Sequence, residues 1–183
     1  MRLFIAIEIP EDLKKWLARL RVDIPGCRWT ALEQIHLTLA FLGEVDEARL
    51  EGLTAALARI RTSEFSLRLV GTGCFPGRQH PRVLWVGVER EPRLEALAAR
   101  VRTVLLAQGI PQEERHFSAH ITLARLKLAK PSECAAFLDQ HRNLKLPPFS
   151  VRDFRLFQSR LTPHSAEHIP LKTFPLKTRS REE

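Results

Sequence analysis

The sequence predicts an α+β fold of two similar lobes, in which antiparallel sheets are flanked by helices. One observation behind this prediction is an element order of strand, helix, strand, helix and strand, which occurs twice along the 183 residues. The other is the pattern His-apolar-Thr-Leu, which occurs at 36–39 and at 120–123 in equivalent strands of the two runs. Because solenoid repeats span only about 20–45 residues, two runs this long indicate an internal duplication instead. We therefore expect a single bilobal domain over 1–183, with the repeat boundary near 71–82.

The first run contains five predicted elements. They are a strand at 2–9, a helix at 10–20, a strand at 34–42, a helix at 46–61 and a strand at 65–70. Pro10 and the two acidic residues after it suit the first turn of a helix. Asp46 is a residue type that caps helices, because its carboxylate accepts backbone N–H groups. Residues 71–82 are rich in Gly, Pro and basic side chains and are predicted to form a loop.

The second run repeats this order. Its predicted elements are a strand at 83–89, a helix at 92–108, a strand at 118–126, a helix at 131–141 and strands at 149–159 and 168–176. Apolar residues recur at helical spacing in the first of these helices, and a proline opens the second. The charged tail at 177–183 is expected to be frayed. The two halves of the sequence need not be the two lobes, because a terminal strand can cross from one sheet to the other.

The composition is that of a globular protein with a substantial core, with 44% hydrophobic and 27% charged residues. No apolar run approaches the roughly 18 residues that a membrane helix needs, and charge follows the first strand too soon for a signal peptide. Cys27, Cys74 and Cys134 are odd in number and form no CxxC pair, so we expect neither a disulfide framework nor a cysteine zinc site. These features favour a cytoplasmic protein.

The formal charge of +8 favours polyanionic partners such as RNA, although solubility alone can explain such a charge. Five basic side chains could rim a site and hold an RNA backbone. They are Arg78, His80, Arg82, Arg115 and Lys127. Ordinary solvated loop charges are an equally good reading of this set.

The two His-x-Thr patterns are the candidate functional site. Strand alternation puts His36 and Thr38 on one face, and it predicts that Ala40 and Ala124 share the histidine face and leave space beside each imidazole. One such triplet is weak evidence, because it occurs often by chance. Two copies at matching places in a repeated topology are much stronger.

The chemistry that this set suits is acid–base catalysis on a phosphate. Imidazole has an ordinary pKa of about 6.5, so one histidine can be a neutral base while the other is a charged acid. The hydroxyls of Thr38 and Thr122 can donate to phosphate oxygens as negative charge grows on them. This division of labour needs no metal and no cofactor.

The segments 34–45 and 120–125 resemble the two signatures of the 2H phosphoesterase superfamily, and most of all its RNA 2′,3′-cyclic phosphodiesterases, also called the 2′-5′ RNA ligase family. The resemblance covers nearly the whole chain, including segments 2–7, 75–88 and 174–176. It implies a bilobal fold whose cleft holds one His-x-Thr from each lobe. It also implies a substrate that carries a 2′,3′-cyclic phosphate, either an RNA end or a nucleotide.

The resemblance further implies unequal roles. His120 is the expected base on water, and His36 the expected acid that protonates the departing O3′, leaving a 2′-phosphate. A 5′-hydroxyl RNA in place of water would give reversible 2′-5′ ligation. Two threonines and Arg125 are expected to bind the phosphate, and Phe41 to pack a nucleobase. The threonines are Thr38 and Thr122.

Three features distinguish this chain. Strict alternation would put Phe41 and Arg125 on the core face, so a bulge or a strand end is expected to turn them toward the histidines. Segment 161–168 lacks the Gly and Tyr that the family often has near its last hairpin. Ala119 stands where a proline commonly precedes the second signature.

Other readings of the same residues are weaker. The pairs His116 with His120 and His164 with His168 have helical metal-ligand spacing, but no nearby carboxylate or cysteine completes a ligand set, so no metal is expected. Trp85 could stack a nucleobase, as could Trp29, but as a strand residue among aliphatics it is expected in the core. Trp29 is expected there as well. No P-loop or GxGxxG pattern is present, so a nucleoside triphosphate is not expected.

The leading hypothesis is a metal-independent hydrolase of 2′,3′-cyclic phosphates at RNA or nucleotide ends. One alternative is a 2H enzyme for another diester, such as a 2′-5′ oligonucleotide or a small cyclic nucleotide. The other alternative is an RNA-binding module without turnover, which would have no need of two proton-transfer groups. Nothing in the sequence demands more than a monomer.

Overall fold

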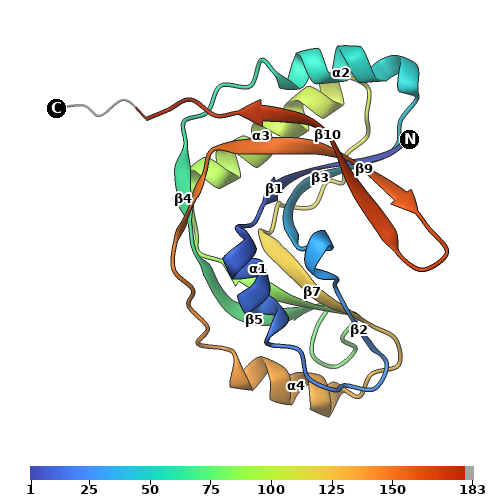
Figure 1. Cartoon of the computed structure of the whole chain (residues 1–183), viewed down its shortest axis with the longest axis vertical. Coiled ribbons are helices and arrows are strands. Elements are labelled where there is room, and N and C mark those ends of the chain that lie inside the picture. The colour runs from blue at the N-terminus through green and yellow to red at the C-terminus, as the bar shows by residue number, and fades with distance from the viewer. Residues whose placement is uncertain (180–183) are drawn as a thin grey trace.

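The computed structural model describes residues 1–179 and places two four-stranded sheets in separate lobes, joined by a two-stranded ribbon (Figure 1). The first sheet has the order β10-β9-β1-β3, the second the order β2-β7-β6-β5, and the ribbon is β4-β8. All neighbouring strands are antiparallel. The strands are β1 (Arg2–Glu8), β2 (Cys27–Trp29), β3 (His36–Glu44), β4 (Phe65–Leu67), β5 (Leu69–Phe75), β6 (Val83–Val88), β7 (His120–Leu126), β8 (Phe149–Val151), β9 (Asp153–Leu161) and β10 (Ala166–Pro175). The helices are α1 (Glu11–Ala18), α2 (Leu50–Leu57), α3 (Pro92–Ala107) and α4 (Pro131–Gln140), with short 3₁₀ helices η1 (Leu32–Gln34) and η2 (Glu47–Arg49).

The two lobes do not coincide with the two halves of the sequence. Strands β9 and β10 join β1 and β3, whereas β2 pairs with β7. Helix α3 follows a strand of the second sheet but contacts β3 and α2. Helix α4 lies in the other lobe (Figure 1), where the carbonyl of Leu138 accepts a hydrogen bond of 3.1 Å from Thr72 of β5. The predicted α+β architecture is confirmed, and so is the expectation that a terminal strand can cross over.

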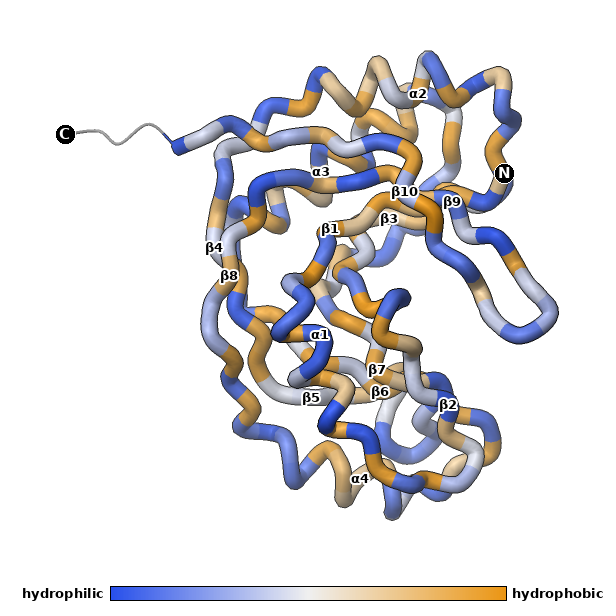
Figure 2. Tube along the Cα trace, viewed as in Figure 1, coloured by the Kyte–Doolittle hydropathy of each residue, from blue (hydrophilic) through white to orange (hydrophobic). Residues whose placement is uncertain are grey.

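Strand β1 is buried on both faces, which explains its unbroken apolar sequence. Leu3, Ile5 and Ile7 belong to the main core. Phe4 and Ala6 point to the opposite face and form a small cluster with Phe157 of β9. The central strands are accordingly among the most hydrophobic stretches of the chain, whereas the loop between β9 and β10 is largely hydrophilic (Figure 2). The first sheet therefore carries a second, aromatic layer on the side away from the main core.

The predicted loop at 71–82 is wrong over its first half, because β5 extends to Phe75. Gly71 has a positive φ of 62° and lies at a register shift between β5 and β6, so it forms a bulge within the strand. A side chain at Gly73 would overlap the ring of Trp85, with 2.2 Å between a Cβ and Cζ2. These glycines serve a bulge and a close approach, which composition alone cannot distinguish from a loop.

Several predicted boundaries also change. Asp46 caps its segment as expected, accepting a hydrogen bond of 3.0 Å from the amide of Ala48, but the segment is η2 followed by α2 and ends at Leu57. The predicted strand at 149–159 is two strands, β8 and β9. Strand β8 pairs with β4 in the ribbon, and after Arg152 the chain enters the first sheet as β9. Strand β2 and helix η1 were not predicted, since three residues are too few to show a period.

The prediction that fraying begins at Lys177 is wrong. The amide of Lys177 donates to Thr62 and its carbonyl accepts from Glu64, each at 2.9 Å, so this residue is held against the segment before β4. Residues 180–183 of that predicted tail lie outside the described residues. Within residues 1–179, no helix is long and apolar enough to cross a membrane.

Candidate active site

Both His-x-Thr motifs lie where the lobes meet. His36 is the first residue of β3 and His120 is the first residue of β7, and these two strands contact each other (Figure 1). Along both strands the order of exposure is the same: half-buried His, buried apolar residue, half-buried Thr, buried Leu and buried Ala, then an exposed residue. The sequence duplication is therefore also a duplication of local structure.

A bulge occupies the same place in both strands. In the first sheet Ala6 pairs with Thr38 while Ile5 pairs with Ala40, so one residue of β3 is skipped. In the second sheet Trp85 pairs with Thr122 while Leu84 pairs with Ala124. The skipped residues are Leu39 and Leu123. The expected bulge is confirmed, and it reverses the alternation after each threonine.

The bulge determines which side chains share the face of His and Thr, called here the motif face of each sheet. Phe41 pairs with Phe4 on that face and is 66% exposed. Arg125 lies on the corresponding face of β7 and is also exposed. The prediction that Ala40 and Ala124 lie beside the imidazoles is wrong, because the bulge turns both into the core.

His36 is enclosed by aromatic rings. Its imidazole stacks on Phe4 with ring centroids 4.9 Å apart, and the ring of Phe157 lies 6.1 Å away. His168 of β10 approaches edge-on at 5.0 Å. No hydrogen bond of the His36 ring occurs among the described residues. Aromatic packing, rather than a polar partner, therefore orients this imidazole.

This environment strongly disfavours a charged His36. Burial, then the nearby His168 and then Lys14 lower the pKa of His36 from 6.5 to about 3. Lys14 is itself buried and forms an ion pair of 3.2 Å with Glu8. The pKa of His168 is lowered by its burial, against the opposing effect of Glu8. Both imidazoles of this cluster are neutral near pH 7 in the free protein.

His120 has a polar partner. Its Nδ1 lies 2.7 Å from the carbonyl oxygen of Ser118, which can only accept, so the hydrogen bond assigns the proton to Nδ1. In the neutral ring Nε2 then carries the free lone pair. Phe75 meets the ring edge-on at 4.9 Å, and Trp85 lies 6.4 Å away. A fixed tautomer with an available Nε2 is the arrangement that a general base needs.

Several residues of the site were not predicted from the sequence. His168 and Phe157 reach the motif face only because β9 and β10 cross into the first sheet, whereas Phe4 lies on β1, which pairs with β3. Trp85 was expected in the core but lies on the motif face opposite Thr122, where two glycines leave room for its ring. Trp29 does pack on the helix side, with its ring 5.4 Å from that of Phe137. When a strand is buried on both faces, its period-two pattern does not indicate which face carries the site.

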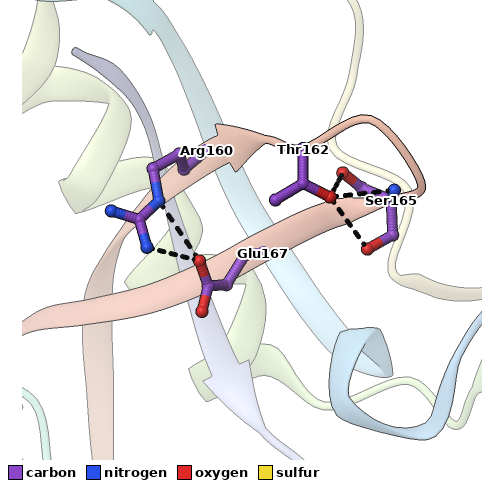
Figure 3. Close-up of polar contacts among 4 residues, drawn as sticks. All are labelled: Arg160, Thr162, Ser165 and Glu167. Carbon is purple, nitrogen blue, oxygen red and sulfur yellow. Dashed lines mark hydrogen bonds and ion pairs between the residues drawn. The ribbon is translucent and has the colours of Figure 1, made fainter.

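The β9–β10 hairpin brings His168 to this cluster, and it is held by local contacts (Figure 3). Arg160 donates two hydrogen bonds to one carboxylate oxygen of Glu167, at 2.6 and 3.2 Å. Thr162 Oγ1 donates to the carbonyl of Ser165 at 2.8 Å and accepts from its amide at 3.0 Å. The hairpin that departs from the family pattern is thus a defined element rather than a loose loop.

Two contacts connect this hairpin to other parts of the molecule. The guanidinium of Arg28, on β2 of the second sheet, donates to the carbonyl of His164 at 3.3 Å. The side chain of Gln34 donates to the carbonyl of Ala166. The first of these contacts spans from one lobe to the other.

Two of the five basic side chains that were expected to rim the site have carboxylate partners. Arg78 pairs with Asp139 of α4 at 2.9 Å, and Arg115 pairs with Glu113 at 3.1 Å. His116 precedes β7 and His164 lies in the hairpin turn, so neither histidine pair has the helical geometry that its spacing suggested. Across residues 1–179, no three potential metal ligands form a group.

Comparison with known proteins adds independent information. The family model described as LigT like Phosphoesterase matches twice, at residues 5–85 and 86–166. A protein of Archaeoglobus fulgidus named RNA 2′,3′-cyclic phosphodiesterase is 33% identical over 177 residues, which cover 95% of this chain and 99% of that protein. One of the same name from Escherichia coli is 31% identical over 185 residues, which cover 96% of each.

Solved structures agree with these matches. The protein TT0787 of Thermus thermophilus aligns with a TM-score of 0.79 at 31% identity, over 96% of this chain and 97% of that one. The E. coli protein LigT complexed with 3′-AMP aligns with a TM-score of 0.77 at 29% identity, also over 96% and 97%. Both alignments extend over the two lobes.

Proposed function

The chain belongs to the LigT-like phosphoesterase family, an enzyme family of phosphodiester hydrolases, and we propose from this membership that its substrate is a 2′,3′-cyclic phosphate at an RNA or nucleotide end. The product is a 2′-phosphate with a free 3′-hydroxyl. The observation that carries the proposal is the unlike state of two histidines at equivalent positions. His120 has a fixed tautomer with an available Nε2, whereas His36 is desolvated and uncharged.

The proposed reaction is a single displacement at phosphorus. Nε2 of His120 removes a proton from water as the water oxygen bonds to phosphorus. The P–O3′ bond breaks, and protonated His36 gives its proton to the departing O3′. Thr38 and Thr122 donate hydrogen bonds to the non-bridging oxygens, where negative charge increases. No step in this sequence requires a metal.

To act as the acid, His36 must be protonated when the substrate is bound, so substrate binding must raise its pKa. Its pKa of about 3 leaves it neutral at pH 7 in the free protein. A bound phosphate anion beside the buried ring favours the imidazolium and raises this pKa. We propose that His36 takes up its proton together with the substrate, so that the acid is formed only where it is needed. A 5′-hydroxyl of RNA in place of water would give 2′-5′ ligation by the same displacement.

A substrate panel tests the proposal. The purified protein is incubated in chelator with a cyclic-phosphate mononucleotide, a cyclic-phosphate oligonucleotide and 2′-5′ and 3′-5′ dinucleotides, and the products are identified. We expect 2′-phosphate products from the cyclic phosphates alone. His36→Ala and His120→Ala should each reduce the rate by about 10²–10⁴-fold, while His116→Ala, an exposed histidine outside the site, should not. Cleavage of a dinucleotide as the main activity, a strict metal requirement, or binding without turnover would each refute it.

A further inference from the structure

The second sheet carries a pair of arginines, of which the family resemblance gives a phosphate contact to Arg125 and no role to Arg28. We propose that Arg28 and Arg125 form a second anion site, which binds the phosphodiester on the 5′ side of the terminal nucleotide and makes RNA ends better substrates than cyclic mononucleotides. This inference rests on the proposed function, since it concerns which cyclic phosphate the enzyme prefers.

The first support is the register of the strands. Arg28 of β2 is directly opposite Arg125 of β7, so both side chains point to the same face of the sheet. The bulge at Leu123 makes that face the one that carries Thr122. Both arginines are exposed. Two like charges directly opposite each other destabilise a pair of strands, so a local structural role does not account for this arrangement.

The second support is the lack of a counterion. In the described part of the chain no carboxylate forms an ion pair with either guanidinium, although six other arginines have such partners. Those six are Arg78, Arg90, Arg93, Arg115, Arg155 and Arg160. Among residues 1–179, the one hydrogen bond that either guanidinium makes is from Arg28 to the carbonyl of His164. A guanidinium has five N–H donors, so this contact orients Arg28 and leaves most of its donors for a ligand.

The third support is position. Arg125 follows Thr122 on the motif face, and Arg28 lies one strand further out, about 4.8 Å away in the direction of the hydrogen bonds. Strand β2 is the edge of its sheet, so the arginines extend from the reacting phosphate toward solvent. A cyclic phosphate ends the RNA at its 3′ side. Every other phosphate of such a substrate therefore lies 5′ of the terminal nucleotide, and guanidinium pairs bind phosphate well.

The test compares two substrates, a cyclic-phosphate mononucleotide and a cyclic-phosphate trinucleotide of the same terminal base. For the wild-type protein we expect a higher kcat/KM on the trinucleotide. In Arg28→Gln the ratio of the two kcat/KM values should fall by about tenfold, and the salt dependence of KM for the trinucleotide should become shallower by about 0.7 in a log–log plot. Arg59→Gln, which removes an equal charge from an exposed position after α2, should change neither.

A trinucleotide with a neutral methylphosphonate next to its terminal nucleotide identifies the contact. The methylphosphonate should lower the kcat/KM of the wild-type protein about as much as Arg28→Gln lowers it on the natural trinucleotide. For the Arg28→Gln variant, the methylphosphonate should lower kcat/KM little further. Equal losses on mono- and trinucleotide, no loss on either, or additive effects of variant and methylphosphonate would overturn the inference. Failure of the proposed function is distinct, because the wild-type protein would then hydrolyse neither cyclic phosphate.

Discussion

At the scale of single residues, two histidines with the same local sequence have different chemistry. The sequence identifies both, because each begins an identical His-apolar-Thr-Leu pattern. It cannot reveal that His36 is packed among Phe4, His168 and Lys14, since those residues come from distant parts of the chain. It cannot reveal the contact of His120 with Ser118 either, because a side-chain tautomer depends on local geometry.

The buried, neutral His36 has a consequence for stability. Its pKa is about 3 in the folded chain against about 6.5 when unfolded, so the unfolded chain binds the proton more readily between these values. The contribution of neutral His36 to the stability of the folded chain is fully present above pH 6.5 and is lost as the pH falls toward 3. Within this window, each unit by which the pH falls lowers the free energy of unfolding by about 1.4 kcal/mol through His36. The lowered pKa of His168 acts in the same direction.

His36→Phe tests this, because phenylalanine keeps the stacking on Phe4 without a titrating nitrogen. Urea unfolding between pH 7 and pH 4 should show a shallower loss of stability in the variant than in the wild-type protein. His141→Phe is the matched control, since the ring of His141 lies against Phe137 of α4, outside the site. Parallel curves for wild type and His36→Phe would mean that His36 is not held neutral by the fold.

At the scale of elements, the paired bulges are what make the site. They turn Phe41 and Arg125 to the side of the histidines, and the sequence could show only that some such irregularity was required. The same limit explains the error at 71–82. Gly71 and Gly73 belong to a strand, where Gly71 allows a bulge and Gly73 a close approach of Trp85. In the sequence such glycines cannot be told from the glycines of a turn.

Gly73→Ala is expected to disturb the site through that contact. Its Cβ would lie 2.2 Å from the ring of Trp85, so the indole must shift. Overpacking of this kind costs about 1–3 kcal/mol of stability, and it would displace a ring that lies near His120. Chemical unfolding and the hydrolysis rate both measure the effect. Gly77→Ala is the control, because nothing lies within 4 Å of its Cβ position, and equal behaviour of the two variants would contradict the assigned packing.

At the scale of the whole molecule, the duplication and the α+β class were predictable, because the element order and the motif both repeat. The exchange of elements between the lobes was predictable only in outline. Which strands and helices cross depends on long-range packing, such as that of α3 on β3 and of β9 on β1. That exchange places His168 beside His36, and it places Arg28 of the second sheet against the β9–β10 hairpin of the first.

The central claim is that the two motifs perform opposite proton transfers on one phosphate. A substrate with sulfur in place of O3′ tests it most directly, because a thiolate leaves without being protonated. Kinetics with the natural and the 3′-thio cyclic phosphate should show that His36→Ala loses about 10²–10⁴-fold on the natural substrate and far less on the thio one. His120→Ala should lose equally on both. Equal losses of His36→Ala on the two substrates, or rescue of His120→Ala by the sulfur, would contradict the assignment of acid and base.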